Sequence, residues 1–516
     1  MDISSLLYDN AKSFGDRIAF FEGNKKYTYK EIAQMTKYAQ GVLSKAGVKK
    51  HSNIILLEPI SVRMYVSLMA IWSLGASVIV FDPTATADYI EKCLTRVKPD
   101  FFIGCKKAFL LKLKLPALRK AEHSFATDKL FSKKAFNDEN IEYKSESTGE
   151  DLPALITFTS GSTGIPKVAV RTQNFLFTQY KIIDRTMSYS DGDIDIAVLP
   201  VFTIANIAKG IGTVIPHKSL SKITTKDPQK IIEQIQDFNI TRITASPAIV
   251  GKLADYSART GQISPTITKL NVGGGPIFPY MMQNVKTAFP NAKLLLVYGS
   301  TEAEPIAEVE YDKLMPEHFN SIANGAGLIG GYVIDDINCK VIKNASDKAI
   351  GNITENEFAN MVLDHEVGEI VVSGNHVLHG YLDGIGDDEN KFDVDNIRWH
   401  RTGDLGYFDD NAMLWLMGRA SAIISDDRGV LYPFAVESAI CTKFAIKHST
   451  VTMYNEKRIL VVECTKAQLP DLEKFKDEIG IDIVLQIDKM PMDIRHHSKV
   501  DYNILRNFVE NAIKSY

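Results

Sequence analysis

The sequence has 516 residues, which is too long for a single hydrophobic core and predicts at least two domains. Hydrophobic residues make up 45% of the chain and charged residues 24%, as in an ordinary globular protein. The formal net charge of −4 argues against a nucleic-acid binder, because it implies no basic face.

Cysteine usage and the N-terminal residues indicate the compartment. The cysteines are scattered without a CxxC pair, which argues against a zinc site and favours a reducing compartment. Residues 1–17 contain no basic stretch followed by a long apolar run, so we expect no secretory signal and a cytoplasmic protein.

The first hundred residues alternate between helix-like and strand-like patterns. Apolar residues at helical spacing predict a helix over 30–46, and a strand over Asn53–Leu57 follows it. Residues 64–81 form a long run without a charge. We expect a buried helix running into a buried strand there, with a membrane span as the alternative. A helix-like run at 89–95 and a strand at Phe101–Gly104 repeat the alternation, which predicts a parallel sheet with crossover helices.

Residues 106–150 are polar, lysine-rich and weakly periodic, so we expect a surface connection there. They lead to an apolar run at 154–158 that is typical of a short strand. A loop of small residues comes next: Thr159, Ser160, Gly161, Ser162, Thr163, Gly164, Ile165, Pro166 and Lys167.

This loop is suited to a polyphosphate. Glycines let the backbone approach an anion closely, and backbone N–H groups, hydroxyls and one ammonium can then surround it. It is not a Walker loop, because Ile165 and Pro166 separate Gly164 from Lys167. An ordinary Ser/Gly turn is the alternative, but the length of the run and its Pro-Lys ending favour a phosphate site.

The middle of the chain continues the α/β pattern. We expect a strand over 193–200, an apolar and aromatic stretch over 201–206, a helix over 227–238, and a strand over Arg242–Ala245. A helix over 248–256, a glycine-rich turn at 273–276 and a strand over 294–297 follow.

A dinucleotide-type fingerprint, GAGLIG, occurs at 325–330, but no strand is predicted before it and strand-like residues come after it, so we reject it. Residues 333–342 and 369–373 predict antiparallel strands of a small barrel. Short strands at 449–454 and 459–464, with helices, predict a small α+β domain at the C-terminal end. We place the boundary after Arg419, which gives domains of 1–419 and 420–516.

Polar residues that could take part in binding or catalysis follow the predicted strands. Glu302, in a loop after a strand, suits Mg²⁺ because this cation prefers carboxylate oxygens, and Thr301 suits a phosphate contact. Asp404, expected in a tight turn, suits the two hydroxyls of a ribose because a carboxylate accepts two hydrogen bonds. Arg419 would add a ribose or phosphate contact. Each of these residues is individually compatible with a plain loop or turn.

The phosphate loop, YGSTE at 298–302, RTGD at 401–404 and the lysine-containing stretch at 491–501 occur in an order that resembles the adenylate-forming superfamily. This superfamily includes acyl-CoA synthetases, luciferases and peptide-synthetase adenylation domains. The family usually has glycine after the loop lysine, whereas this chain has Val168.

The resemblance implies a fold and a set of site residues. It implies an α/β fold in which a large N-terminal domain has two parallel-sheet subdomains and a small β-barrel, followed by a small, mobile α+β domain. It implies ATP and Mg²⁺ as cofactors, with Glu302 at the metal. Lys499, Glu302 and Thr163 would be catalytic, with Lys499 bridging the carboxylate and the α-phosphate. The nucleotide-binding residues would be Thr159, Ser160, Gly161, Ser162, Thr163, Gly164, Lys167, Gly274, Gly275, Pro276, Tyr298, Gly299, Ser300, Thr301, Asp404, Arg419 and Lys499.

Within the family, several stretches look like the β-lactone synthetases of long-chain olefin biosynthesis. They are KPDFFIG at 98–104, LPVF at 199–202, WHRTGDLGY at 399–407 and DIRHHSK at 493–499. CoA-ligating enzymes usually carry Lys-Asp after the hinge Gly-Arg, whereas this chain has the uncharged run 420–422. These differences favour activation of a 3-hydroxy fatty acid followed by attack of its own hydroxyl, with Phe202 and Asn206 as candidate pocket residues.

Two other functions stay open from the sequence. An acyl-CoA synthetase with an unusual hinge would pass the acyl group to CoA, and a non-catalytic adenylate-binding module is the third reading. The expected small-molecule partner is a carboxylic acid, joined by CoA if the protein is an acyl-CoA synthetase. Pathway enzymes are candidate protein partners. We expect neither nucleic-acid binding nor a membrane span. No base for the hydroxyl proton is assigned: His217, His379 and His400 are each more typical of structural histidines.

Overall fold

The computed structural model describes residues 3–81, 85–132, 151–159, 166–217, 228–343, 349–492 and 500–514. The chain forms two compact units. Unit 1 contains Met1–Thr244 and Leu378–Asp387, and unit 2 contains Ala245–Val377 and Asp388–Tyr516. Residues Leu378–Asp387, named the return segment here, therefore belong to unit 1 although the chain on either side of them belongs to unit 2.

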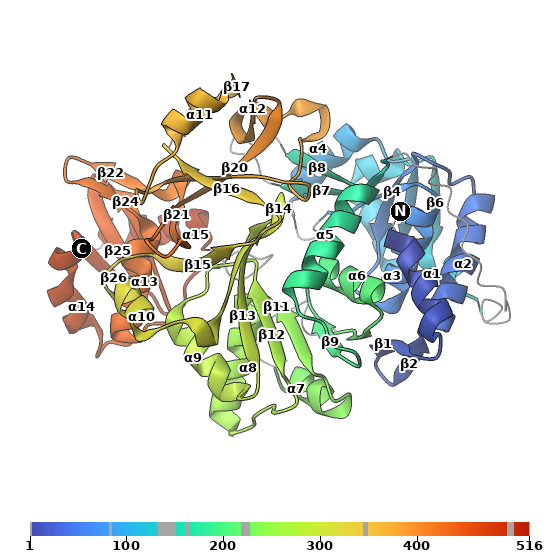
Figure 1. Cartoon of the computed structure of the whole chain (residues 1–516), viewed down its shortest axis with the longest axis horizontal. Coiled ribbons are helices and arrows are strands. Elements are labelled where there is room, and N and C mark those ends of the chain that lie inside the picture. Colours follow the sequence, from blue (N-terminus) through green and yellow to red (C-terminus); the bar gives the residue numbers. More distant parts are fainter. Residues whose placement is uncertain are drawn as a thin grey trace. The chain divides into compact units, whose positions relative to one another are not determined.

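Unit 1 contains a six-stranded sheet in which the predicted β-α-β alternation is confirmed. Neighbouring strands pair in parallel except at one edge, where β7 and β8 are antiparallel. In spatial order the strands are β6 (His123–Ala126), β5 (Phe101–Gly104), β3 (Asn53–Leu57), β4 (Ser77–Ile79), β7 (Pro153–Thr159) and β8 (Lys167–Thr172). The helices α1 (Ile3–Phe14), α2 (Tyr29–Lys45) and α3 (Val62–Ser73) pack against one another, as the blue ribbons of Figure 1 show.

The uncharged run at 64–81 is a buried helix followed by a buried strand, as predicted. Nearly all residues of α3 are buried, and all three residues of β4 are buried. Apolar residues surround the helix, so its hydrophobicity serves the core of unit 1. Among the described residues, no helix is long and apolar enough to cross a membrane.

The expected surface connection over 106–150 contains more regular structure than the sequence predicts. Residues 133–150 lie outside the described part. The remainder forms the 3₁₀ helices η1 (Lys106–Leu113), η2 (Pro116–Arg119) and η3 (Thr127–Leu130), together with β6. The strand β6 is short and partly exposed, so it carries no hydrophobic run that could reveal it.

A second set of unit 1 strands runs in the order β11 (Arg242–Ala245), β9 (Ile194–Ala197), β10 (Gly212–Val214), β1 (Ile18–Glu22) and β2 (Lys25–Thr28). All neighbours are parallel except the β1–β2 hairpin. The helices α4 (Ala87–Val97), α5 (Gln173–Thr186), α6 (Pro200–Lys209) and α7 (Pro228–Asp237) belong to the same unit. Proline at its first turn and glycine after its last residue mark the ends of α6.

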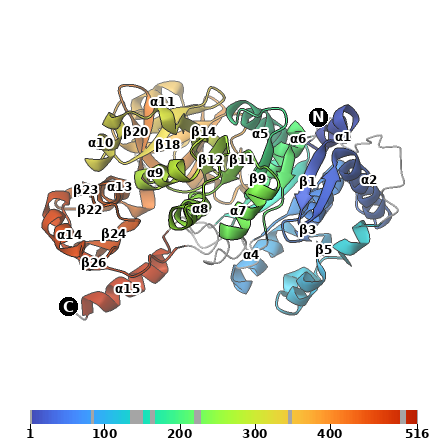
Figure 2. The same cartoon turned by 90° about the horizontal axis from the view of Figure 1, so that it is seen from below.

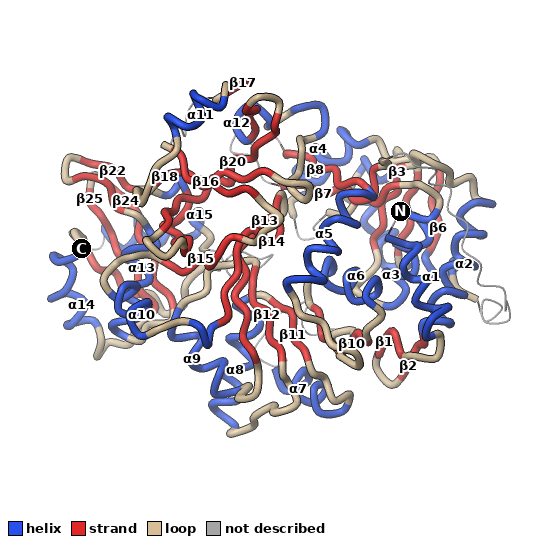
Figure 3. The backbone as a smooth tube through the Cα atoms, in the orientation of Figure 1, coloured by secondary structure: helices blue, strands red, loops and turns tan. Residues whose placement is uncertain are grey.

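Unit 2 begins with α8 (Pro247–Thr260), β12 (Lys269–Gly273), α9 (Pro279–Ala288) and β13 (Lys293–Ser300). The strands β12 and β13 are parallel and lie side by side in Figure 3. From β13 the pairing continues antiparallel through β14 (Ala303–Glu310), β15 (Leu328–Val333), β21 (Met413–Arg419), β20 (Ile397–Phe408), β18 (Gly368–Ser373) and β16 (Asn338–Ile342).

The strand predicted at 369–373 is confirmed as β18, and the one predicted at 333–342 is β16 only over 338–342, because 334–337 connect it to β15. The strands β16 and β18 pair with Ile342 opposite Glu369. Beside them, β17 (Gly351–Ile353) pairs in parallel with β19 (Lys391–Val394). The helices of this region are α10 (Pro316–Ala323), α11 (Glu355–Met361) and α12 (Asp387–Asn390). The GAGLIG run follows α10 and leads into β15, so its rejection as a dinucleotide site is consistent with the structure.

The C-terminal part contains the predicted α+β elements, which Figure 2 shows in red. The strands β24 (His448–Tyr454), β25 (Lys457–Glu463) and β26 (Ile483–Gln486) form one sheet, and β22 (Ile424–Asp426) and β23 (Gly429–Leu431) form a hairpin. The helices are α13 (Pro433–Phe444), α14 (Leu469–Phe475) and α15 (Tyr502–Lys514). The boundary expected after Arg419 coincides with the last residue of β21 and lies inside unit 2, so the division at 419/420 stays a prediction.

A buried carboxyl in this part makes stability depend on pH. Glu437 of α13 is 5% exposed, and its Oε1 accepts hydrogen bonds from Thr450 Oγ1 at 2.9 Å and Val451 N at 3.2 Å. Burial raises the pKa of Glu437 to about 8 from its ordinary value of 4.5. The folded protein holds this proton more tightly than the unfolded chain does. The contribution of protonated Glu437 to stability is therefore fully present below pH 4.5 and is lost as pH rises through about 8.

We therefore expect Glu437→Gln to reduce the loss of stability between pH 5 and pH 8.5. A shift of this size corresponds to at most about 5 kcal/mol, and glutamine keeps an acceptor without a charge to desolvate. Urea unfolding midpoints at several pH values measure the effect, with the exposed Glu478→Gln as the matched control. Parallel pH profiles for the wild type and Glu437→Gln would contradict the assignment.

Candidate functional site

The predicted phosphate loop connects two paired strands of unit 1. Thr159 ends β7 and lies opposite Lys167, the first residue of β8, so the loop leaves and re-enters the sheet at one position. The strand predicted before the loop is confirmed as β7. The candidate residues Ser160, Gly161, Ser162, Thr163 and Gly164 lie outside the described residues.

Lys167 is held by the return segment. Its side chain is only 9% exposed, and its Nζ lies 5.6 Å from the centroid of the Tyr381 ring. Gly386 has a φ of +98°, which favours glycine, and a Cβ there would lie 2.9 Å from Lys167 Cδ, so the lysine side chain would have to shift. Tyr381 also forms a β-bridge with Ala169, which fixes the return segment to β8.

Arg96 joins the same two segments from the end of α4. Its Nη1 donates to Pro166 O at 2.7 Å, and its Nη2 donates to Leu382 O at 2.8 Å. One guanidinium thus ties the end of the phosphate loop to the return segment. The sequence offered no signal for this role, because a single arginine in the last turn of a helix usually serves the helix dipole.

In unit 2, the loop between β13 and β14 carries Glu302. Ser300 pairs with Ala303, so Thr301 and Glu302 form the tip of a tight hairpin. The Glu302 N–H donates to Ser300 Oγ at 3.3 Å, and both tip residues are half-buried. Tyr298 and Gly299 directly precede Ser300, at a β-bulge of β13. The prediction that this motif ends a strand is confirmed.

Asp404 lies at the centre of a polar cluster in unit 2. Its Oδ2 accepts a hydrogen bond from Tyr298 Oη at 2.9 Å, and its Oδ1 accepts one from Arg419 Nη1 at 2.9 Å. The Asp404 N–H donates to Thr402 Oγ1 at 3.0 Å, and Arg419 Nη1 also contacts Thr402 O at 3.1 Å. Thr402 is thus a cluster member that sequence reasoning missed.

The expected tight turn around Asp404 is wrong, because this residue lies inside the long strand β20. Glu369 pairs with Leu405, but Val371 pairs with Arg401, so β20 has extra residues opposite one residue of β18. Gly403 takes the left-handed conformation at the bulge, with a φ of +68°. The bulge turns the Asp404 carboxylate towards Tyr298 and Arg419.

Charge and burial keep Tyr298 and Arg419 of this cluster protonated. Burial, followed by the neighbouring Asp404 charge, raises the pKa of Tyr298 well above its ordinary value, so the phenol stays a donor. The Asp404 carboxylate raises the pKa of Arg419 above its ordinary value. The Asp404 side chain is 20% exposed, and each of its oxygens has a lone pair beyond the bond described, so it can accept hydrogen bonds from a diol.

The glycine run after β12 offers a surface without side chains. Gly273 lies so close to β13 that a Cβ there would be 2.9 Å from Val297 O. Gly274 is exposed with a φ of +82°, and a Cβ there would meet nothing within 4 Å. Gly275 and Pro276 follow it, both half-buried. A flat ring can rest against backbone of this kind.

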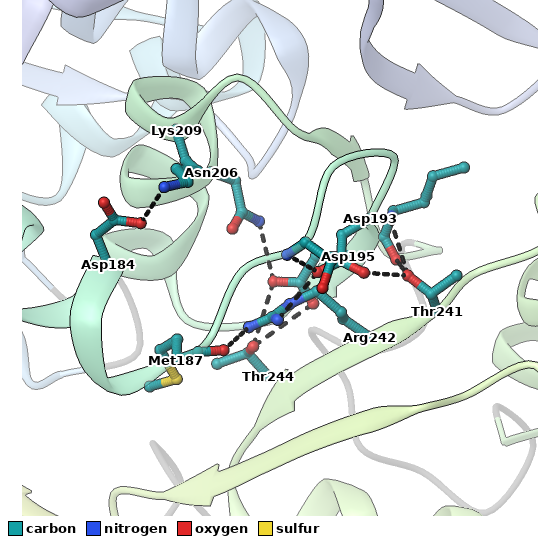
Figure 4. A network of polar contacts seen from close by, with 11 residues as sticks. Asp184, Met187, Asp193, Asp195, Asn206, Lys209, Thr241, Arg242 and Thr244 are labelled. Atoms are coloured by element: carbon teal, nitrogen blue, oxygen red, sulfur yellow. Dashed lines mark hydrogen bonds and ion pairs between the residues drawn. The ribbon is translucent and has the colours of Figure 1, made fainter. Parts of the chain in front are cut away.

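The two candidate pocket residues lie on α6 in unit 1. Asn206 is fully buried, and its Nδ2 donates to Asp195 Oδ2 at 3.0 Å, within the network that Figure 4 shows. Thr244 Oγ1 donates to the same carboxylate at 3.2 Å, and burial raises the pKa of Asp195 against the opposing charge of Arg242. Phe202 is 4% exposed. The pocket role of Phe202 and Asn206 stays a prediction.

The remaining candidates are Lys499 and the three histidines. Lys499 lies in 493–499, outside the described residues. Of the histidines, His400 is 3% exposed and its Nδ1 lies 3.1 Å from Asn390 O, which is typical of a structural histidine. His217 and His379 are exposed.

The chemistry of these groups fits a nucleotide and a hard cation. A carboxylate that accepts from two donors and retains free lone pairs suits a diol, and a lysine beside a Ser/Gly loop suits phosphate. Mg²⁺ is usually held by one or two carboxylates together with substrate phosphates, so a single carboxylate at the tip of the β13–β14 hairpin suffices.

Comparisons with known proteins agree with this chemistry. The family model described as AMP-binding enzyme matches residues 7–382, more than half of the chain. An olefin beta-lactone synthetase of Stenotrophomonas maltophilia (strain K279a) is 27% identical over 476 residues, covering 87% of this chain and 84% of that protein. A 4-coumarate-CoA ligase 1 of Narcissus pseudonarcissus is 24% identical, covering 86% of this chain and 80% of that protein.

The fold is also that of solved adenylate-forming structures. O-succinylbenzoate Coenzyme A Synthetase (MenE) from Bacillus subtilis, in complex with ATP and magnesium ion, has a TM-score of 0.75 at 19% identity. The alignment covers 97% of this chain and 99% of that chain. At this identity the similarity establishes the fold alone.

Proposed function

The chain belongs to the AMP-binding enzyme family and is an AMP-forming ligase, and from this premise we propose that it converts a 3-hydroxy fatty acid into a β-lactone. The observation that carries the proposal is the similarity to an olefin beta-lactone synthetase along 87% of the chain. The stretches at 399–407 and 493–499 and the uncharged residues after Arg419 support it.

In the first half-reaction, a carboxylate oxygen of the acid attacks the α-phosphorus of ATP. The bond between the α-phosphorus and the bridging oxygen breaks, and pyrophosphate leaves. Lys167 and the loop at 159–164 would hold the β- and γ-phosphates, while Asp404 would accept hydrogen bonds from the ribose hydroxyls. Bound Mg²⁺ would neutralise charge on the phosphates, and Glu302 would hold it.

In the second half-reaction, the 3-hydroxyl oxygen of the same molecule attacks the activated carbonyl carbon. The bond from that carbon to the AMP oxygen breaks, AMP leaves and the hydroxyl proton is released, which gives a four-membered lactone. Ring closure is intramolecular, so holding the hydroxyl near the carbonyl and excluding water supplies most of the advantage. Apolar residues of α6, including Phe202, are the proposed lining of the acyl pocket.

A second candidate function is that of an acyl-CoA ligase. The similarity to a 4-coumarate-CoA ligase along 86% of the chain favours it. It would share the first half-reaction and differ in the nucleophile, which would be the CoA thiol. Incubation with ATP, Mg²⁺ and a 3-hydroxy fatty acid, with and without CoA, separates the two: lactone without CoA supports the first, and product only with CoA supports the second.

The contacts of Arg96 give a prediction about ATP binding. We expect Arg96→Ala to raise the KM for ATP about tenfold, because the end of the phosphate loop loses its tie to the return segment, while the KM for the acid stays unchanged. Steady-state kinetics measure this, and added guanidinium is expected to restore part of the affinity. The control Arg63→Ala removes an arginine of the same unit whose side chain is 47% exposed. An equal loss for both substrates, without guanidinium rescue, would contradict the positioning role.

A further inference from the structure

A basic segment of unit 1 stands apart from the acidic balance of the chain. Residues 106–120 read KKAFLLKLKLPALRK and contain no acidic residue, whereas the whole chain has a net charge of −4. The basic residues of this segment are Lys106, Lys107, Lys112, Lys114, Arg119 and Lys120. We name residues 106–120 the basic segment; none of them takes part in the candidate site.

Two leucines of the basic segment point away from the core. In a 3₁₀ helix, side chains three residues apart lie above one another, so Lys107, Leu110 and Leu113 of η1 share one face. Leu110 is 65% exposed and Leu113 is 74% exposed, the largest values among the exposed large apolar side chains of the described residues. The opposite face carries Ala108, which is buried, and Leu111, which packs on the core.

The exposed face is held in a fixed position. Arg119 Nε donates to Lys112 O at 2.7 Å, and Arg119 Nη2 donates to Leu113 O at 3.1 Å, so the end of η1 is tied to η2. The Lys112 ammonium lies 4.9 Å from the centroid of the Phe102 ring, which belongs to β5. The two leucines are therefore presented by a packed support.

Acidic neighbours offset only part of the positive charge. Asp128 lies 3.6 Å from Lys106, and Glu91 lies 3.9 Å from Lys120, both in ion pairs whose lysines are largely exposed. Exposed pairs of this length contribute little and leave the lysines able to move to another anion. Lys107 and Lys114 are exposed on either side of the leucine pair.

We infer that the basic segment docks on the surface of an anionic lipid bilayer. Two neighbouring exposed leucines suit insertion among acyl chains, while lysines with long flexible stems keep their ammonium groups at the level of the headgroups. An excess of Lys and Arg without acidic residues selects anionic headgroups over neutral ones. The inference concerns a surface outside the candidate site and does not depend on which reaction the protein catalyses.

Vesicle sedimentation with the 516-residue chain tests the inference. At low salt the protein is expected to pellet with vesicles of phosphatidylcholine and phosphatidylglycerol, not with vesicles of phosphatidylcholine alone, and salt should release it. Leu110→Ser with Leu113→Ser should lower the partition coefficient at least about tenfold, because two apolar side chains lose their insertion. Lys107→Gln with Lys114→Gln should lower it about 25-fold, at roughly fivefold per charge.

A matched control separates this surface from general stickiness. Ile263→Ser with Ile504→Ser removes two apolar side chains of unit 2 that are 50% and 54% exposed, and vesicle binding is expected to stay unchanged. Circular dichroism melts check that each variant is folded. Equal pelleting with both kinds of vesicle, no pelleting with either, or wild-type binding by the leucine variant would each overturn the inference.

Discussion

Lys499→Ala is expected to reduce pyrophosphate release at least about 1,000-fold while ATP still binds. During adenylation a carboxylate approaches the α-phosphate, so two negative groups meet and charge develops on the phosphate oxygens. A positive group aimed at that charge stabilises the transition state more than the bound ground state. Removing it would therefore lower kcat, whereas the phosphate loop and Asp404, in their proposed roles, would continue to bind ATP.

Two assays distinguish this effect from misfolding. Pyrophosphate release measures turnover, and calorimetric titration measures the Kd for ATP, which is expected to change less than about fivefold. Lys514→Ala removes an exposed lysine of α15, paired with Glu510, and serves as the control. If Lys499→Ala turned over at the wild-type rate, the catalytic role taken from the resemblance would be wrong.

The second large effect is expected at Asp404, the proposed ligand of the ribose hydroxyls. Asp404→Asn should lower kcat/KM for ATP about 100-fold to 1,000-fold. The substitution would remove the charge that, in the proposed role, strengthens hydrogen bonds from two ribose hydroxyls, each contributing about 1.5–3 kcal/mol. It also removes the negative charge beside Arg419, whose Nη1 lies 2.9 Å from Asp404 Oδ1. The KM for the carboxylic acid should change little.

A second aspartate–arginine pair in unit 2 provides the control. Asp393 Oδ2 lies 2.8 Å from Arg398 Nη1, and both side chains are about a quarter exposed, so Asp393→Asn breaks a pair of similar geometry outside the candidate site. We expect this variant to keep wild-type kinetics. The wild type should prefer ATP over its deoxyribose form, as judged by kcat/KM, and Asp404→Asn should lose most of this preference. An undiminished preference in the variant would contradict the assigned contact.

The arrangement of the elements follows from local patterns. Apolar periodicity identified the crossover helices. It also predicted three strands with their observed bounds: Asn53–Leu57, Phe101–Gly104 and Arg242–Ala245. Such elements bury one face or both, so the pattern of their side chains reports their environment. The short strand β6 was missed because its half-exposed residues carry no such pattern.

The site was harder to predict, because it depends on contacts distant in sequence. The position of Glu302 in a loop after a strand could be predicted, but its hairpin with β14 was not, and the bulge at Gly403 depends on the register between β20 and β18. Likewise, Arg96 contacts Leu382, which lies 286 residues away in the sequence. The sequence shows that Arg96 is charged, and only the fold shows which backbone carbonyls it contacts.

Incubation of the purified protein with ATP, Mg²⁺ and a long-chain 3-hydroxy acid, without CoA, followed by mass spectrometry of the organic extract, is the deciding measurement. The proposed reaction predicts one AMP and one pyrophosphate for each β-lactone formed, with no increase in rate when CoA is added. A product that forms only with CoA, as an acyl thioester, would contradict it.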